Sequence, residues 1–204
     1  MKTLIAVPCM DMVAAPFAQS LAALNKQGDC IISFLIGSLI YQSRDNLAIQ
    51  AIREQCDYVM WFDSDMIFPP NTLMKMLDHA KEGRDIVTGL YFRRRNPFTP
   101  VLFSKLEENE EGICSWADYN DYPKDSVFEI AGCGFGCCIV KTEVFADLLG
   151  KYGSCFTPFG GVGEDLAFSM RAREAGYKIW CDSTIKCGHV GQVIVNENVY
   201  ESTK

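Results

Sequence analysis

The sequence predicts an α/β fold in which a mostly parallel central sheet carries helices on both faces and is joined by a smaller antiparallel part. Short apolar runs alternate with amphipathic helical segments four times over residues 1–92, which is the pattern of a parallel sheet covered by helices. About half of the 204 residues are apolar (49%), which is enough for a substantial core. From Pro97 to Val140 the segments become short and strand-like, which predicts the antiparallel part.

The first half is expected to contain four buried strands. A short apolar run bounded by turn residues is typical of a buried strand. Pro8 closes the first of these runs, and Gly37 with Ser38 ends the second. The four strands are expected at Thr3–Val7, Cys30–Ile36, the run that begins at Tyr58, and Asp85–Tyr91.

Three helices are expected between these strands, because apolar residues recur there at helical spacing. The first follows Asp11 and ends at Gly28, the second has Ser43 as its N-cap, and the third opens at Pro69 and runs through Lys81. Their inward-facing residues are Phe17, Leu21, Leu24, Leu47, Ala48, Ala51, Ile52, Leu73, Met74, Leu77 and Ala80.

The second half begins with a predicted antiparallel hairpin, Pro97–Lys105 and Ile113–Tyr122, which turns in the acidic stretch EENEEG. Two strands then flank the glycine-rich bend AGCGFG. A helix capped by Thr142 follows, then a helix from GGVGEDL to Ala175, a strand at Tyr177–Cys181 and an irregular tail. No linker or repeat interrupts the chain, so we expect a single domain.

Charge and composition exclude several classes of protein. With 19 basic and 26 acidic residues the net charge is −7, which argues against general nucleic-acid binding. No apolar run reaches the length of a membrane span, and the N-terminal MKTLIAVPCM lacks the features of a signal peptide. We therefore expect a cytoplasmic protein without a membrane span. Its ten cysteines form no CxxC pair and are expected to be reduced thiols.

The stretch YVMWFDSDMIFPP, Tyr58–Pro70, carries the main chemical signal. Asp63 and Asp65 follow a buried strand at the sheet edge where such folds bind ligands, and an extended chain would project both carboxylates toward the same side. Two close carboxylates repel each other unless a cation lies between them or one is protonated. Mg²⁺ or Mn²⁺ would suit these oxygen ligands and would neutralise phosphates on a ligand. A pair of aspartates that merely form the following turn is the alternative.

Two later stretches offer further candidates. Glu164 and Asp165 open a helix, where acidic residues suit the helix dipole; beside a metal-bound pyrophosphate, one of them could instead accept a proton from a hydroxyl. His189 is one of two histidines and lies between glycines in KCGHVG, where it could approach a metal or serve an ordinary structural role.

Basic residues mark two candidate phosphate contacts. Arg44 and Asn46 begin the second expected helix, and a helix start with arginine can contact a phosphate or nucleotide. A cap followed by a surface arginine explains this pair as well. The run Arg93–Arg95 could meet a phosphate or an anionic acceptor, or could be a solvated basic turn.

Taken in order, these features resemble the GT-A fold glycosyltransferases, in particular family 2-like enzymes of the small bacterial and phage type. The features are a first strand ending in proline, an Arg/Asn helix start, a strand followed by DSD, the GCGFG bend, GGVGEDLAFSMRAREAGYKIW and a late histidine. The resemblance covers nearly the whole chain. It implies a Rossmann-like GT-A domain over residues 1–204, with a nucleotide-binding half (1–92) and an acceptor and catalytic half (93–204).

The resemblance also implies an activity and roles for individual residues. It implies metal-dependent transfer of a sugar from a nucleotide-diphospho-sugar to an acceptor hydroxyl, with Mn²⁺ or Mg²⁺ as cofactor. Asp63, Asp65 and His189 would match the metal site, Asp165 the base of an inverting reaction, and Glu164 an acceptor contact or alternate base. The positions that would bind the nucleotide are Pro8, Asp11, Arg44, Asn46, Asp63, Ser64 and Asp65.

Two departures from the family pattern leave details open. Gly37 and Ser38 stand where the family often has an acidic residue that contacts the nucleoside, so the donor could be a UDP-sugar, which we favour, or a GDP-sugar. The QxxRW element of processive synthases is missing, so we expect a single transfer to a glycan, a lipid-linked or a protein acceptor. A metal-dependent phosphohydrolase and a non-catalytic nucleotide-sugar or glycan-binding module are the alternative functions.

Overall fold

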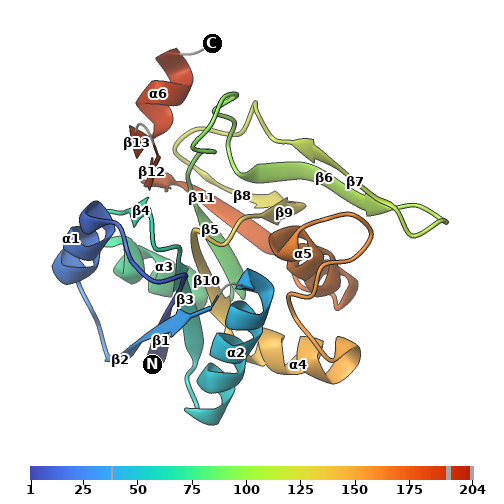
Figure 1. Cartoon of the computed structure of the whole chain (residues 1–204), viewed down its shortest axis with the longest axis horizontal. Helices are drawn as coiled ribbons and strands as arrows, with labels where there is room; N and C mark the ends of the chain where they lie inside the picture. Colours follow the sequence, from blue (N-terminus) through green and yellow to red (C-terminus); the bar gives the residue numbers. More distant parts are fainter. Residues whose placement is uncertain (38, 192–193, 203–204) are drawn as a thin grey trace.

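The computed structural model describes residues 1–37, 39–191 and 194–202 and confirms the α/β fold (Figure 1). A seven-stranded sheet with the order β2-β1-β3-β10-β5-β11-β8 forms its centre. The strands are β1 (Lys2–Cys9), β2 (Asp29–Ile36), β3 (Tyr58–Phe62), β5 (Ile86–Leu90), β8 (Val127–Ile130), β10 (Cys137–Lys141) and β11 (Ile179–Lys186). Only β10 and β8 run against the direction of the other strands, so the sheet is mostly parallel.

Strand β10 is the main topological feature that the sequence pattern leaves open. It lies in the middle of the sheet, antiparallel to β3 on one side and to β5 on the other. Cys137, its first residue, is in register with Phe62, the last residue of β3. The GCGFG bend that precedes β10 therefore lies beside the chain as it leaves β3.

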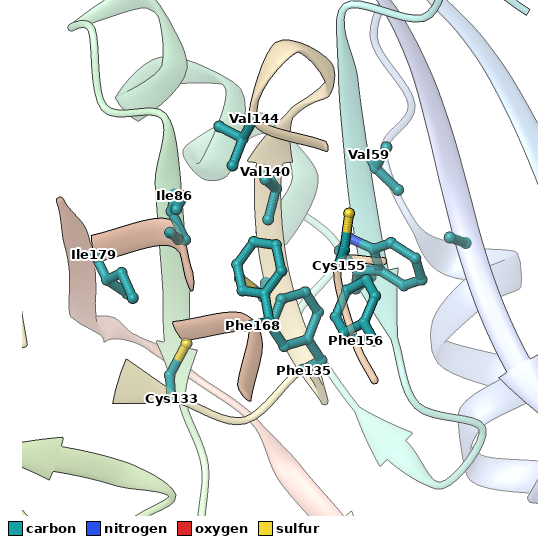
Figure 2. Packing of buried hydrophobic residues seen from close by; sticks show 14 of the residues in the cluster. Val59, Ile86, Cys133, Phe135, Val140, Val144, Cys155, Phe156, Phe168 and Ile179 are labelled. Atoms are coloured by element: carbon teal, nitrogen blue, oxygen red, sulfur yellow. The ribbon is translucent and has the colours of Figure 1, made fainter. Parts of the chain in front are cut away.

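Helices cover both faces of this sheet, as predicted. Because successive side chains of a strand point to opposite faces, Leu4 of β1 enters one core and Ile5 the other. On the Ile5 side pack α1 (Ala15–Ala23) and α3 (Thr72–Lys81); on the Leu4 side pack α2 (Ile40–Arg53), α4 (Thr142–Tyr152) and α5 (Glu164–Glu174). The Leu4 side contains an aromatic cluster in which the rings of Phe156 and Phe168 stack with their centroids 5.0 Å apart (Figure 2).

Two small antiparallel sheets flank the central one. The predicted hairpin is present as β6 (Leu102–Glu108) and β7 (Cys114–Asp118), and β9 (Gly132–Cys133) joins it. The other small sheet consists of β4 (Met66–Ile67), β12 (Gly188–Val190) and β13 (Ile194–Val195), and α6 (Glu197–Ser202) follows it. The prediction of an irregular tail is therefore wrong, because β12 pairs with β4, the strand that follows Asp65.

Several predicted element boundaries also need correction. Helix α2 starts at Ile40, so Ser43 is a buried helical residue instead of the N-cap. Arg44 and Asn46 lie within the helix rather than at its start. Thr142 is the first helical residue of α4 rather than its cap. Strand β11 extends to Lys186, beyond the predicted end at Cys181.

Two expectations about the whole chain can be compared with the structure. All ten cysteines are free thiols, which agrees with the prediction of reduced cysteines. None of the helices in the described ranges combines the length and the apolar character that a membrane span requires.

Candidate functional site

The candidate site lies where the parallel strands end and α5 begins. Strand β3 stops at Phe62, and Asp63 to Asp65 form a turn in which the amide of Met66 donates to the carbonyl of Asp63 (3.1 Å). The amide of Asp63 itself donates to the carbonyl of Gly136 (3.2 Å). The extended conformation that would align the two aspartates therefore does not persist, and each carboxylate has its own partners.

Arg44 is the partner of Asp63, and it also contacts the start of α5. Its Nη2 lies 3.0 Å from Asp63 Oδ1 and 3.5 Å from Asp165 Oδ1, and its Nε lies 3.9 Å from Glu164 Oε1. The Arg44 side chain is only 2% exposed. One buried guanidinium thus links an aspartate of the predicted nucleotide-binding half to the two carboxylates of the predicted catalytic half.

Aromatic rings enclose the Arg44 guanidinium from the core side. Its carbon lies 5.2 Å from the ring centroid of Phe135, 5.9 Å from that of Trp61 and 6.0 Å from that of Phe156. A cation over an aromatic face is attracted to the ring, which offsets part of the cost of shielding it from water. These rings and the three carboxylates together hold the arginine in one place.

This environment changes the protonation chemistry of the cluster. Burial, together with the nearby charges of Glu164 and Asp63, raises the pKa of Asp165 to about 7 against the opposing effect of Arg44. Burial alone would lower the pKa of Arg44, but its carboxylate neighbours raise it, so the arginine stays charged. Asp165 is therefore a carboxylate that can take up and release a proton near neutral pH, as a general base requires.

Asp65 belongs to a second group, with His189. Strand β12 pairs with β4 so that His189 is opposite Met66, and the amide of Val190 donates to the carbonyl of Asp65 (2.8 Å). This pairing places His189 Nε2 3.5 Å from Asp65 Oδ1. The structure thus brings together two of the three predicted metal ligands, from segments more than a hundred residues apart.

The tautomer of His189 follows from its other contact. Nδ1 lies 2.8 Å from the carbonyl oxygen of Phe92, which can only accept a hydrogen bond, so Nδ1 carries the proton. In the neutral ring, Nε2 then directs a lone pair toward the Asp65 carboxylate, and two acceptors face each other. Burial lowers the pKa of His189, but Asp65 and the Phe92 carbonyl raise it, so the pKa is raised overall. Burial raises the pKa of Asp65, but His189 and Arg94 lower it, so the pKa is lowered overall.

Asp65 and His189 supply two ligands for a divalent metal. A carboxylate and an imidazole whose other nitrogen is fixed by a carbonyl form a recurrent ligand pair, of which the carboxylate suits Mn²⁺ or Mg²⁺. Within the described ranges no three His, Cys, Asp or Glu side chains gather in a way that could hold a metal. The pair would therefore leave positions for oxygens of a ligand and for water. The predicted third ligand, Asp63, is instead directed at Arg44.

The remaining predicted nucleotide contacts are dispersed around this centre. Pro8 is buried at the end of β1, Ser64 is half-buried in the turn, and Asp11 and Asn46 are exposed. The carbonyl of Ser64 accepts a hydrogen bond from the amide of Ala14 (2.9 Å), which ties the loop after β1 to the turn. Residues two apart on a helix do not share a face, so α2 directs Arg44 inward and Asn46 outward.

Tyr91 is a buried residue at this centre that the sequence patterns do not single out. Its hydroxyl accepts a hydrogen bond from the amide of Gly136 (3.0 Å), and its ring packs edge-on against His189 with centroids 5.8 Å apart. The glycines of GCGFG allow this approach. A Cβ on Gly136 would lie 2.9 Å from Tyr91 Cζ, and one on Gly134 would overlap the Tyr91 hydroxyl oxygen.

Replacing Gly134 by alanine is therefore expected to destabilise the protein. The new methyl group would displace Tyr91 and would lie 2.7 Å from Val101 Cγ1, and overpacking of this kind costs about 1–3 kcal/mol. Gly150→Ala is the matched control, because its Cβ in α4 would meet no atom of the described chain within 4 Å, and it should add up to about 1 kcal/mol. Urea denaturation measures both changes, and equal stability of the two variants would contradict this role of Gly134.

Another connection that the sequence does not indicate comes from Asp45. Its Oδ1 accepts the amides of Cys155 (2.8 Å) and Phe156 (3.2 Å), and its Oδ2 accepts the hydroxyl of Ser154 (2.6 Å). Asp45 thereby fixes the loop between α4 and α5, which positions Phe156 against Arg44.

The inward direction of Arg44 does have a sequence signal, because Arg44, Leu47, Ala48 and Ala51 follow the helical spacing of one face.

Comparisons with known proteins agree with this arrangement. The family model described as Glycosyl transferase family 2 matches residues 46–149, just over half of the chain. A search of curated protein sequences found no match. The match includes Asp63 and Asp65 but ends before Glu164, Asp165 and His189.

Solved structures of similar fold cover nearly the whole chain. A197 from STIV has a TM-score of 0.68 at 18% identity, over 97% of this chain and 95% of that one. GalNAc-T7, in a structure with UDP, GalNAc and Mn²⁺, has a TM-score of 0.62 at 10% identity, over 94% of this chain and 44% of that one. At these identities the similarity establishes a shared GT-A fold.

Proposed function

The chain belongs to glycosyl transferase family 2, and from that membership we propose that it transfers a sugar from a nucleotide-diphospho-sugar to an acceptor hydroxyl. A UDP-sugar is the favoured donor and a GDP-sugar the second possibility. The similarity of fold to GalNAc-T7, whose structure contains UDP, GalNAc and Mn²⁺, supports a donor and a metal of this type. The acceptor is proposed to be a glycan, a lipid-linked molecule or a protein.

The observation that carries this proposal is the sharing of one Arg44 nitrogen by Asp63 and Asp165. Asp63 leads directly into the turn that holds Asp65, and Asp165 opens α5. Arg44 therefore brings a carboxylate with a pKa of about 7 next to the segment that carries the Asp65–His189 pair. A proton acceptor beside a site for a bound diphosphate is what an inverting glycosyl transfer needs.

Each group then has a defined task in the reaction. Asp165 accepts the proton of the acceptor hydroxyl as that oxygen attacks the anomeric carbon from the side opposite the diphosphate, which inverts the configuration in a single displacement. Glu164 contacts the acceptor, and Pro8, Asp11 and Ser64 contact the nucleotide. Asp65 and His189 would hold Mn²⁺ or Mg²⁺, which when bound would stabilise negative charge on the leaving diphosphate. Arg44 keeps Asp63 and Asp165 in position.

The proposed halves of the chain follow from the same assignment. Residues 1–92 carry the proposed nucleotide contacts and Asp65, whereas residues 93–204 carry the base, the acceptor contact and His189. The site needs both halves, because the Arg44 cluster and the Asp65–His189 pair each draw residues from both. The reaction would accordingly depend on the intact domain.

A thermal-shift panel of nucleotide sugars, measured with and without Mn²⁺, tests the donor proposal. A ligand that binds only the folded state adds about 2.7 kcal/mol to its stability at a hundred times its dissociation constant. We expect one UDP-sugar to raise the unfolding temperature in the presence of Mn²⁺ and to have little effect in its absence. A panel in which no nucleotide sugar stabilises the protein, combined with release of phosphate from a generic phosphoester, would instead favour the phosphohydrolase alternative.

A further inference from the structure

The loop after β5 places a cation on Asp65. Three arginines, Arg93 to Arg95, lie in this loop, and their contacts differ. Arg93 Nη2 binds Asp118 Oδ1 of β7 (2.8 Å), so this side chain supports the hairpin. The Arg94 guanidinium forms an ion pair with Asp65 Oδ2. Within the run, Arg94 is thus the residue directed at the proposed metal ligand.

The same loop also orients the other proposed ligand. Phe92, two residues before Arg94, provides the carbonyl that fixes the tautomer of His189. Its position is secured by an antiparallel bridge to Pro100 and by the hydrogen bond from the amide of Arg93 to the carbonyl of Thr99 (2.9 Å). Arg94 therefore extends from a well-anchored backbone toward Asp65, whose two oxygens face His189 on one side and Arg94 on the other.

The two partners of this ion pair differ in how freely they can move. The Arg94 side chain is 56% exposed, whereas that of Asp65 is 23% exposed. The backbone of Asp65 is also held, because its carbonyl accepts a hydrogen bond from the amide of Val190. An exposed ion pair contributes at most about 1 kcal/mol, so a divalent ion can replace the arginine at Asp65 at small cost. A released arginine would remain close to the ligands of that ion.

We propose that Arg94 is a displaceable counter-ion of the donor site, which neutralises Asp65 in the free enzyme and binds the donor diphosphate once a divalent metal occupies Asp65 and His189. This inference rests on the proposed function, because it requires a metal-bound diphosphate at this place. An arginine suits the second task, since its planar guanidinium donates two parallel hydrogen bonds to a phosphate group. Arg94 would then be a specificity-determining contact for a diphosphate over a monophosphate.

The proposal predicts opposite effects of one substitution in two binding measurements. Arg94→Ala removes the competitor for Asp65, so in the absence of nucleotide the variant should bind Mn²⁺ about two- to fivefold more tightly, as measured by electron paramagnetic resonance. With Mn²⁺ saturating, calorimetry should show UDP binding weakened about tenfold, and UMP binding changed much less. Arg95 is the neighbouring exposed arginine, so Arg95→Ala is the matched control and should behave like the wild type. Arg94→Lys should recover part of the UDP affinity.

The two titrations test the role of Arg94 and the metal site separately. Tighter Mn²⁺ binding together with weaker UDP binding in Arg94→Ala supports the proposal. A variant that equals the wild type in either titration, or that matches Arg95→Ala in both, overturns the role of Arg94 while leaving the metal site intact. If the wild type itself binds no Mn²⁺ and binds UDP equally with and without it, the metal assignment of the proposed function fails together with this inference.

Discussion

Asp165→Asn is expected to reduce glycosyl transfer by about a thousandfold, because a positioned general base typically contributes 10²–10⁴ to the rate. Asparagine has nearly the same shape, and its carbonyl oxygen can occupy the place of Asp165 Oδ1, which lies 3.5 Å from Arg44 Nη2. The cluster should therefore stay assembled, and UDP should bind with unchanged affinity in the presence of Mn²⁺. Turnover and calorimetry on the same preparation separate the two effects.

The pH dependence of the wild type provides an independent check on this base. Because the pKa of Asp165 is raised to about 7, kcat/KM should fall as the pH drops below 7 and the carboxylate takes up a proton. Glu164→Gln is the matched control: it keeps the base but removes a neighbouring charge that raises this pKa, so the midpoint should move to lower pH. Normal turnover in Asp165→Asn would refute the assignment of the base.

Arg44→Met should cost both stability and activity. Methionine fills a similar volume among Trp61, Phe135 and Phe156, but it leaves Asp63, Glu164 and Asp165 without their shared cation. Removing one partner of a fully buried ion pair costs about 3–5 kcal/mol; since these carboxylates are 21–29% exposed, we expect about 2–3 kcal/mol here. Asp63 and Asp165 would also separate, so transfer should fall by at least about tenfold, even at temperatures where the variant is folded.

Urea denaturation and turnover at saturating donor measure these two effects of Arg44→Met. Arg53→Met, at the exposed end of the same helix, is the control and should change both quantities little. Arg44→Lys keeps the charge but not the planar fork and should be intermediate. An Arg44→Met protein as stable and as active as the Arg53→Met control would show that the cluster has no positioning role.

The sequence allows much of the fold to be predicted because its apolar residues follow the patterns of buried strands and of amphipathic helices. The apolar run of β1 and the three- and four-residue spacing of Leu47, Ala48 and Ala51 identify a strand and a helix without any tertiary information. Which strand lies beside which depends on contacts distant in the sequence. The apolar run of β10 identifies a strand, but nothing local places it antiparallel between β3 and β5.

The site also contains residues with a local sequence signal and residues that are placed by contacts distant in the sequence. Asp63, Asp65 and Asp165 carry local signals, since carboxylates after a buried strand and at a helix start stand out. The partners of these residues do not, because they come from other segments: His189 reaches Asp65 through the pairing of β12 with β4. The interpretation of Arg44 as a surface arginine is wrong, because Arg44 lies on the same helical face as Leu47 and Ala51 and therefore points into the core.

Calorimetric titration of UDP into the wild type and into Asp65→Ala, each with and without Mn²⁺, tests the proposed metal-dependent donor site most directly. We expect Mn²⁺ to strengthen UDP binding to the wild type by at least about tenfold, and this dependence to disappear in Asp65→Ala because His189 alone cannot retain the ion. UDP binding that is equally strong with and without Mn²⁺ in the wild type, or a metal dependence that survives in Asp65→Ala, would contradict it.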